Sequence, residues 1–392
     1  MAKIIHLGYT HKIKDTRIFE KECKALAKQG NEVAFITSNR NGDYNGGLED
    51  NIQLKTLPLK NIRVIRLLLY IYDLKKECLE LDGDVYHIHE PYLIPLVKPL
   101  KKRSKIVIYD KHENTYHGSK KRLSDRFGKV IGTFLAKKFA AYEKKWINKC
   151  DGYIYVTPQN EISDIKCPSA LIPNFPKLVE QDLKENVTGF DIDKKDFKLC
   201  YCGGVSPIWS LLEITEAINE ADFEDISFEI AGPGGNDYID KIKEADTGNK
   251  SVYLGKIPFE DVKEVYKNGH VGMAVLKKEL GGRFDIEGTL ANTKIYEYMQ
   301  QSIPVIYTNF SIWREMGEEY KFGIAVNPYD KKELIAAVKY LFDNRDEAKK
   351  MGCEGKRAVL EKYNWQQYEN TFFELYKAAM KGKFFGNKDN LK

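Results

Sequence analysis

The sequence predicts an α/β protein made of two Rossmann-like domains, each built on a parallel sheet. Short β-rich runs alternate with segments of helical periodicity, which is typical of doubly wound sheets. The alternation breaks once, at the proline-containing stretch 170–177, and resumes at 197. The chain has 392 residues, more than the roughly 250–300 at which a single core usually divides. We therefore expect an N-terminal domain at 1–172, a linker at 173–197 and a C-terminal domain from 198 to 365.

The N-terminal domain is predicted from five β-rich runs and one clear amphipathic helix. The expected strands are 3–9, 31–37, 85–89, 105–110 and 152–157. The helix is expected at 16–30, where apolar side chains recur near helical spacing and a glycine ends the pattern. Parallel strands bring their carboxyl ends to one edge of the sheet, where ligands bind.

The C-terminal domain repeats this organisation. Strands are expected in 197–204, 228–235, 251–256, 271–276 and 303–308, and helices at 207–221, 292–301, 331–344 and 364–380. Glycines follow two of these strands, in CYCGGV and IAGPGG; they are Gly203, Gly204, Gly232 and Gly234. Such turns let the backbone approach a phosphate closely. The first turn of the chain, GYTHKIKD, lacks the G-x-G-x-x-G pattern of a dinucleotide-binding dehydrogenase.

The cysteines and the lengths of the apolar runs indicate the cellular compartment that we expect for the protein. The seven cysteines are scattered without a C-x-x-C pair, which argues against a disulfide framework or a zinc site and favours a reducing cytoplasm. The opening MAKIIHLGYT is predicted to be a strand rather than a signal peptide. No run of 18 apolar residues is present, so we expect no membrane span.

Positive charge is concentrated in one segment. Net charge is only +5, but residues 98–150 hold 16 lysines and arginines against 4 acidic residues. Within this segment, 119–149 carries a helical stripe of apolar side chains. One interpretation is a core-facing helix pair with a solvated basic back. The other is docking of 98–149 on an anionic membrane surface. Nucleic acid is disfavoured because no nucleic-acid-binding motif is present.

Several passages resemble the GT-B glycosyltransferases of the large retaining family four. They are DTRIFEKECKALAKQGNEVAFIT, HIHEPYLIPL, IVIYDKHENTYHG, IPNFP, YCGGVSPIWSLLEITEAI and NTKIYEYMQQSIPVIYT, the last being the most specific match. The Trp-bearing helix from Asn364 is similar to the C-terminal helix that crosses back to the first domain, so 366–392 would complete that domain. The resemblance covers nearly the whole chain and implies a deep cleft between the two domains.

The resemblance implies an activity. A nucleotide-sugar, most often UDP-linked, would be held on the second domain, and its sugar would pass with retention to an acceptor held by the first. No metal or other cofactor is expected. Helix N-termini, backbone N–H groups and basic side chains would stabilise the leaving diphosphate. The acceptor would be a glycan or a polyprenyl-linked sugar, in capsule, O-antigen or related surface polysaccharide synthesis at the cytoplasmic face of the plasma membrane.

Donor residues follow from the E-x7-E pattern of the family. Glu297 matches its second position and would bind the ribose hydroxyls; a helical ion pair with Lys294 is the plainer alternative. The first position is Thr289, a departure from the pattern, and Asp285 or Glu287 is an alternative sugar contact. Asn292 and Thr293 open the donor-binding helix and are expected to line the same site.

A second departure concerns the diphosphate. The basic residue that the family places after the glycine turn is replaced by Trp209. The charge would then come from another cation. The candidates are Lys294, Arg283, Lys256, Lys277 and Lys278. Lys294 is favoured because the positive end of its helix dipole points the same way; Arg283 is the second choice.

The acceptor-side and catalytic candidates lie in the first domain. His112 matches a family histidine near the transferred sugar and is expected to contact a sugar hydroxyl or phosphate. His87 and His89 are two residues apart on a strand, and we expect only one of them, His89, to face the ligand, followed by Glu90. Asp15 and Arg17 are further acceptor-side candidates, with helix capping as the alternative role of Asp15.

Two other functions remain open at this point. Trp209 and Thr289 also fit a catalytically degenerate GT-B subunit that binds a partner transferase. A nucleotide-sugar epimerase would share the architecture and convert the donor without an acceptor. Binding of nucleotide without turnover would favour the first alternative, and conversion of the donor alone would favour the second.

Overall fold

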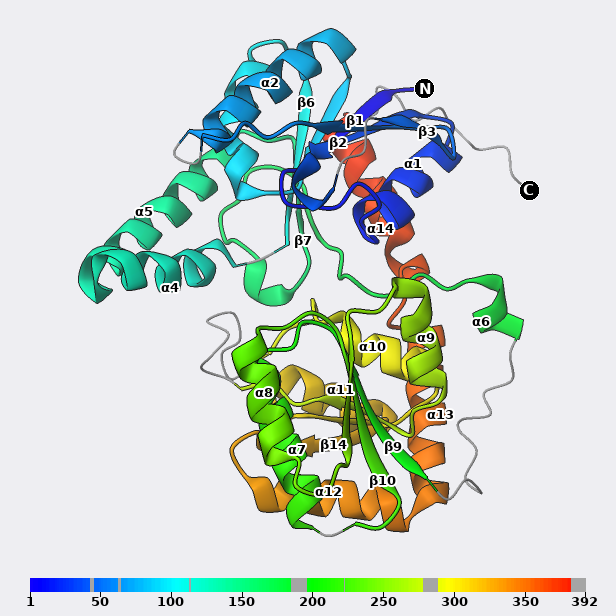
Figure 1. Ribbon diagram of the computed structural model, residues 1–392. Helices are drawn as coiled ribbons and strands as arrows, with labels where there is room; N and C mark the ends of the chain where they lie inside the picture. Colours follow the sequence, from blue (N-terminus) through cyan, green and yellow to red (C-terminus); the bar gives the residue numbers. More distant parts are fainter. Residues whose placement is uncertain are drawn as a thin grey trace. The chain divides into compact units, whose positions relative to one another are not determined.

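The computed structural model describes residues 1–42, 46–62, 65–112, 114–184, 196–221, 223–277 and 288–381. The chain forms two compact units (Figure 1). The N-terminal unit comprises 1–174 together with the chain from Tyr368 onward, and the C-terminal unit comprises Phe175–Gln367. Each unit has its own sheet and its own core.

The N-terminal unit is built on a mostly parallel sheet of eight strands. Their bounds are β1 Lys3–Leu7, β2 Glu32–Ser38, β3 Gly47–Glu49, β4 Ile52–Leu57, β5 Val85–Ile88, β6 Ile106–Lys111, β7 Gly152–Tyr155 and β8 Ser169–Leu171. Their order is β3-β4-β2-β1-β5-β6-β7-β8, and only β3 is antiparallel to its neighbour. The order reverses between β1 and β5, which creates the switch point where ligands bind in open α/β sheets.

Helices cover both faces of this sheet. They are a π-helical turn at Ile18–Cys23, α1 Lys24–Lys28, α2 Arg66–Leu81, α3 Val97–Lys101, α4 Thr115–Phe127, α5 Lys129–Ile147 and α14 Gln366–Ala379. Short 3-10 turns lie at Asn39–Asn41, Pro91–Leu96 and Pro158–Asn160. The last helix, α14, packs on the strands by burying Phe372 and Tyr376. The hydroxyl of Tyr376 lies 2.7 Å from Nδ1 of His87.

The C-terminal unit is built on a fully parallel sheet of six strands. They are β9 Phe197–Cys202, β10 Ile226–Ala231, β11 Ser251–Gly255, β12 Val271–Ala274, β13 Val305–Thr308 and β14 Gly323–Val326. The order β11-β10-β9-β12-β13-β14 places the switch point between β9 and β12. The inner strands are buried on both faces, as expected for a sheet with helices on each side.

The helices of the C-terminal unit lie on both sides of the strands (Figure 1). They are α6 Glu180–Lys184, a 3-10 turn at Pro207–Trp209, α7 Leu211–Glu220, α8 Asn236–Ala245, α9 Phe259–Lys267, α10 Thr293–Gln300, α11 Ser311–Tyr320, α12 Lys331–Asp343 and α13 Arg345–Glu361. Two tight contacts set the packing of α10 and α13. Gly272 of β12 leaves room for the ring of Tyr298, and Gly352 of α13 touches the carbonyl of Ser302.

The predicted α/β class with two parallel sheets is confirmed. Among the described residues, no helix is long and apolar enough to cross a membrane.

Candidate functional site

The glycine turns of the C-terminal unit meet at the carboxyl ends of β9 and β10. The N–H of Gly203 donates to the carbonyl of Ala231 at 2.8 Å, and the N–H of Gly232 donates to the carbonyl of Gly255 at 2.7 Å. Gly203 has φ +152° and Gly232 has φ +135°, in the region that favours glycine. A Cβ on Gly232 would lie 1.8 Å from the carbonyl oxygen of Gly203. The close approach of these two turns therefore requires glycine.

Gly234 also takes part in the contact between the two glycine turns, whereas the space beside Gly204 is open. Gly234 forms a parallel bridge with Val205, and a Cβ there would come within 2.8 Å of the Val205 side chain. A Cβ on Gly204 would meet nothing within 4 Å. The four glycines that the sequence singled out thus belong to one structure, in which Gly204 alone leaves space beside its backbone.

Lys294 reaches this turn from the first residues of α10. A Cβ on Gly203 would lie 2.3 Å from Nζ of Lys294, so the ammonium group occupies the space beside that glycine. The same ammonium lies 4.7 Å from the ring centroid of Trp209 and 5.4 Å from that of Tyr201. Burial lowers the pKa of Lys294, and the nearby Glu297 offsets this only in part.

Trp209 thus has a place that the sequence did not predict. The family's cation is absent from its position, and the indole ring instead contacts the cation supplied by Lys294. Trp209 closes the 3-10 turn Pro207–Trp209 that follows the glycine loop, and its ring also packs 5.4 Å from the ring of Tyr201. The partly buried ammonium forms no ion pair with a carboxylate within the described part of the chain.

Glu297 lies one turn along α10 from Lys294. Its Oε2 accepts a hydrogen bond of 3.2 Å from the hydroxyl of Tyr266, and the carboxylate is partly exposed. The helical ion pair with Lys294, the plainer alternative, is not formed among the described residues. Tyr266, on α9, was not predicted; an aromatic residue in an amphipathic helix gave no signal that its hydroxyl would orient this carboxylate.

The start of α10 provides polar groups beside Lys294. The Asn292 side-chain oxygen caps the helix by accepting from the N–H of Lys294 at 3.2 Å. Its Nδ2 is buried and has no hydrogen-bond partner in the part of the chain that the structure describes. Thr293 is the first residue of the helix and is partly buried. A buried donor without a partner at a helix N-terminus indicates a place where an acceptor group of a ligand can bind.

The hydroxyl and carbonyl groups of Thr289 are both used in hydrogen bonds. Its hydroxyl accepts from the N–H of Ala291 at 3.0 Å, and its carbonyl accepts from Nε1 of Trp313 at 2.9 Å. The side chain is buried. Thr289 therefore shapes the entry to α10.

The remaining predicted cations differ in their availability. Lys256 follows β11 and is exposed. Lys277 forms an ion pair with Glu213 of α7, which compensates its charge. Arg283 and Lys278, with the alternative sugar contacts Asp285 and Glu287, lie outside the described residues.

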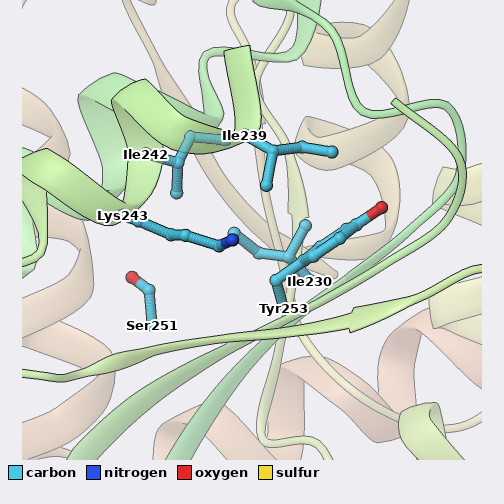
Figure 2. A pocket seen from close by; sticks show the side chains of 6 residues that line it. All are labelled: Ile230, Ile239, Ile242, Lys243, Ser251 and Tyr253. Atoms are coloured by element: carbon cyan, nitrogen blue, oxygen red, sulfur yellow. The ribbon is translucent and has the colours of Figure 1, made fainter. Parts of the chain in front are cut away.

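A small cavity lies behind these turns, between α8 and the strands β10 and β11 (Figure 2). Ile230, Ile239 and Ile242 supply apolar walls, and the Lys243 amine points into the space near Tyr253. The hydroxyl of Tyr253 donates to the carbonyl of Gly232 at 2.8 Å. None of the predicted donor residues lines this cavity, and Tyr253 links its wall to the glycine turn.

In the N-terminal unit, the predicted polar residues gather at the carboxyl ends of β1, β5 and β6. Glu90 follows β5 and accepts from the backbone N–H of Thr10 at 2.8 and 3.1 Å, as well as from the Thr10 hydroxyl. Its carboxylate is buried and lies 3.9 Å from Nε2 of His11. Glu90 thereby fixes the loop after β1.

Asp15 caps the turn that begins the first helix. Its Oδ1 accepts from the N–H groups of Arg17 and Ile18, at 2.9 and 3.0 Å. Its Oδ2 lies 3.1 Å from Nδ1 of His11. Burial alone would raise the pKa of Asp15, but the His11 hydrogen bond and charge lower it below the usual range. The same pair raises the pKa of His11, against the effect of burial.

Arg17 is a buried partner of carboxylates. Its Nε lies 2.9 Å from Oδ2 of Asp110 and 3.0 Å from Oε1 of Glu22, and its Nη1 donates to the carbonyl of Ile172. Only 2% of the residue is exposed. Arg17 therefore acts on the site through Asp110.

His112 is only partly buried. Its side chain is 18% exposed, and its Nε2 lies 3.0 Å from Oδ2 of Asp110 and 3.3 Å from Nδ1 of His89. Asp110 is buried; burial would raise its pKa, but Arg17 and His112 hold the pKa of that carboxyl well below its usual range. Asp110, two residues before His112 in the sequence, orients the imidazole. Glu113, on the other side of His112, lies outside the described residues.

The expectation that only one of His87 and His89 faces the ligand was wrong. Side chains at i and i+2 of a strand lie on the same face, and the two rings stack with centroids 4.3 Å apart. Both residues are buried, and so is His6 on the adjacent strand β1. Burial lowers the pKa of His6 and His87 well below the usual value and lowers that of His89 to about 3.

The basic segment forms two helices that cross closely. A Cβ on Gly132 of α5 would lie 2.3 Å from the backbone nitrogen of Ser124 in α4. Several apolar side chains of the predicted stripe point to solvent; these are Phe127, Val130, Phe134 and Tyr142, of which Val130 is 83% exposed. The interpretation of a stripe that faces the core therefore fails for these residues, because the two helices bury only one side of each other.

Family models match both units. The model described as glycosyl transferases group 1 matches residues 182–358, and the model described as Glycosyltransferase Family 4 matches residues 17–174. The chain belongs to the family-four glycosyltransferases. No curated protein matches this glycosyltransferase by sequence.

Solved structures show the fold of the glycosyltransferase to be GT-B. It resembles a sucrose-phosphate synthase from Thermosynechococcus elongatus with a TM-score of 0.71 and 14% identity, over 97% of this chain and 100% of the other. A glycosyltransferase from Rickettsia africae matches with a TM-score of 0.67 and 14% identity, over 97% and 99%. Anabaena HepE in complex with UDP and glucose matches with a TM-score of 0.67 and 10% identity, over 96% and 100%.

Proposed function

We propose that the protein transfers a sugar from a nucleotide-sugar, UDP-linked, to a glycan or lipid-linked acceptor, with retention and without a metal at the diphosphate. The observation that carries this proposal is the partly buried Lys294 ammonium beside Gly203, without a carboxylate partner among the described residues. A buried cation without a counterion at a helix N-terminus favours a diphosphate as its partner. Anabaena HepE, a structural neighbour, is in complex with UDP and glucose, which supports UDP as the carrier.

The donor contacts follow from the C-terminal unit. Lys294 and the N-terminus of α10 bind the diphosphate, and Asn292 Nδ2 donates to one of its oxygens. Glu297 accepts the ribose hydroxyls, held in place by Tyr266. Gly204 leaves room for the nucleotide beside its backbone. Lys256 and, from outside the described residues, Arg283 are further cations that we assign to the diphosphate.

The N-terminal unit supplies the residues for the transferred sugar and the acceptor. His112 contacts a sugar hydroxyl or the phosphate, because it is held by Asp110 and is partly open to solvent. Glu90 and Asp15 shape the loop after β1 on the acceptor side, and His89 and Arg17 position His112 through Asp110.

The acceptor is proposed to be carried on a lipid, in surface polysaccharide synthesis such as capsule or O-antigen. Support comes from α4 and α5, where exposed Phe127, Val130 and Phe134 are interleaved with lysines and arginines. Such a surface binds anionic membranes by inserting apolar side chains while its cations meet headgroups. The enzyme would act as a peripheral protein at the inner face of the plasma membrane.

Calorimetry of nucleotide binding tests the donor site. UDP, GDP and ADP are titrated into the full chain and into Lys294→Met, with Lys243→Met as the control at a lysine outside the proposed donor site. We expect saturable binding of UDP that is lost in Lys294→Met and kept in the control. Failure of every nucleoside diphosphate to bind the folded protein would contradict the proposal.

A flotation assay tests the membrane surface separately. Vesicles of phosphatidylcholine with about 30% phosphatidylglycerol are mixed with the wild type and with a Val130→Ser/Phe134→Ser double variant. We expect the wild type to float with the vesicles and the variant to lose most of this binding. Equal flotation of both proteins, or no flotation of the wild type, would contradict membrane docking by this surface.

A further inference from the structure

Four buried side chains in the N-terminal unit surround one point, and the proposed transfer reaction assigns no ligand to them. Oε2 of Glu22, in the π-helical turn Ile18–Cys23, lies 3.8 Å from Nδ1 of His6, from Nδ1 of His87 and from Nε2 of His89. These four atoms lie within 4.8 Å of one another. Each of the four residues is at most 1% exposed.

The carboxylate in this cluster is only partly compensated. Among the described residues, neither oxygen of Glu22 has a well-oriented hydrogen-bond partner, although both are buried. Arg17 lies 3.0 Å from Oε1, but the same guanidinium also pairs with Asp110. One cation thus faces two carboxylates, which leaves one negative charge when both are ionised. Buried charges in proteins are normally paired, hydrogen-bonded or bound to a metal.

The spacing of the donor atoms suits a small divalent cation. Ligand atoms around a tetrahedral zinc ion lie about 3.3 Å from one another, given metal–ligand distances of about 2.0–2.2 Å. The three oxygen–nitrogen distances of 3.8 Å are slightly longer, and the distance of 2.9 Å between His6 Nδ1 and His89 Nε2 is slightly shorter. The two distances between a His87 nitrogen and the other imidazole nitrogens are at most 4.8 Å, so shifts of up to about 1 Å would bring all four atoms to bonding distance.

A further contact resembles the surroundings of known metal ligands. The other ring nitrogen of His89, Nδ1, lies 3.5 Å from Oδ2 of Asp110. A histidine that binds a metal usually donates its second N–H to a carboxylate, which fixes the tautomer and strengthens the ligand. Asp110 is itself held by Arg17. Two competing contacts would have to give way to the ion: the hydrogen bond of 2.9 Å between His6 Nδ1 and His89 Nε2, and the contact of 2.7 Å between His87 Nδ1 and the Tyr376 hydroxyl.

We propose that His6, Glu22, His87 and His89 bind one divalent transition-metal ion, zinc being the best match for three imidazoles and one carboxylate. The ion would link β1 and β5 to the π-helical turn. It would thereby hold in place the buried His89, which contacts His112. It is a structural site in the N-terminal unit, separate from the diphosphate contacts that we assign to Lys294 in the C-terminal unit. The cysteines are not needed, because no described cysteine joins this cluster.

Metal content and cobalt spectroscopy test the site on the full chain without a polyhistidine tag. The protein is dialysed against EDTA, loaded with ZnCl2 or CoCl2, freed of excess metal and analysed by mass spectrometry. We expect about one metal ion per chain. The cobalt form should show the visible absorption of a four-coordinate nitrogen and oxygen site, without thiolate charge-transfer bands. A metal-free chain, or cobalt bands that indicate thiolate ligands, would overturn the proposal.

Variants locate the ion. Glu22→Gln removes the anionic ligand while keeping the side-chain size, and His117→Gln is the control at an exposed histidine of α4. We expect Glu22→Gln to lower zinc affinity by at least 100-fold and the control to leave it unchanged. If Glu22→Gln does not fold, X-ray absorption spectroscopy of zinc in the wild type identifies the ligands instead. The proposed site predicts nitrogen and oxygen neighbours and the multiple scattering of imidazole rings. Unchanged affinity in Glu22→Gln, or sulfur neighbours in the spectrum, would show that Glu22 is not a ligand of the metal and would overturn the proposal.

Discussion

The ammonium group of Lys294 lies 4.7 Å from the ring centroid of Trp209. Trp209 occupies the position where the family's basic residue is expected, and its ring contacts the cation that comes from α10. Loss of the basic residue was the main sequence argument for a degenerate partner subunit. The structure provides a different source of positive charge at the same glycine turn, so this argument no longer distinguishes the two functions.

The contact between Trp209 and Lys294 should contribute to nucleotide affinity. Replacing Trp209 by Ala removes the ring that holds the ammonium beside Gly203, and a cation–π contact is worth about 0.5–2 kcal/mol. We expect the Kd of the nucleoside diphosphate to rise by about 2- to 30-fold. Trp209→Phe, which keeps a ring, should lose less. Affinity of Trp209→Ala equal to that of the wild type would contradict a positioning role.

The assignment of Glu297 to the ribose can be tested with a matched ligand. Glu297→Ala should weaken the binding of a nucleoside diphosphate by about 10- to 150-fold, because hydrogen bonds to a charged group contribute about 1.5–3 kcal/mol. A 2′,3′-dideoxynucleoside diphosphate lacks the hydroxyls, so it should bind wild type and variant equally. Calorimetry with both ligands gives the coupling free energy between Glu297 and the ribose hydroxyls. An equal loss for the two ligands would place Glu297 elsewhere on the nucleotide.

As pH rises, nucleotide affinity should begin to fall at a lower pH than it would if Lys294 had the pKa of an ordinary lysine. Burial lowers the pKa of Lys294, so its positive charge, which attracts the diphosphate, is present below that lowered pKa and lost as pH rises through it. Lys294→Arg keeps its charge throughout. We expect the ratio of the two affinities to change below the pH at which an ordinary lysine titrates. Titration of the ligand itself affects both proteins alike, so a constant ratio would refute this role of the Lys294 charge.

Gly232 should be intolerant of any side chain. Gly232→Ala would place a Cβ 1.8 Å from the carbonyl oxygen of Gly203 at φ +135°. Backbone strain of this kind costs about 1–3 kcal/mol before the clash is counted. We expect the melting temperature of the C-terminal unit to fall by about 5 °C or more. Gly235→Ala is the control, since a Cβ there meets nothing within 4 Å; equal melting temperatures for the two variants would contradict the close turn contact.

His112 should affect turnover more than donor binding. We expect His112→Asn to lower kcat by about 100-fold or more, because it removes a polar contact at the reacting sugar. The Kd of the nucleoside diphosphate should stay within about 2-fold of the wild type. His117→Asn, at an exposed position of α4, is the control. A variant with full kcat would remove His112 from the catalytic residues.

Local pattern was enough to predict most strands and several helices. The run KIIHLGY gave β1, and helical periodicity in 331–344 gave α12 almost to the residue, because burial on one face leaves a regular apolar spacing. The short edge strands β3 and β8 gave no such signal. Helix α13 was missed because its buried side is made largely of small residues, Ala348, Gly352 and Gly355. Such residues give only a weak apolar periodicity in the sequence.

The sequence by itself predicted the two α/β domains and the glycine turns and singled out Glu297, Lys294 and His112 as candidates, because these depend on residue type and spacing along one segment. Only the tertiary structure decided which groups meet. Trp209 and Lys294 are far apart in sequence, and Glu22 reaches His6, His87 and His89 from another element. Such contacts depend on how a parallel sheet brings the ends of separate strands together, which no local pattern encodes.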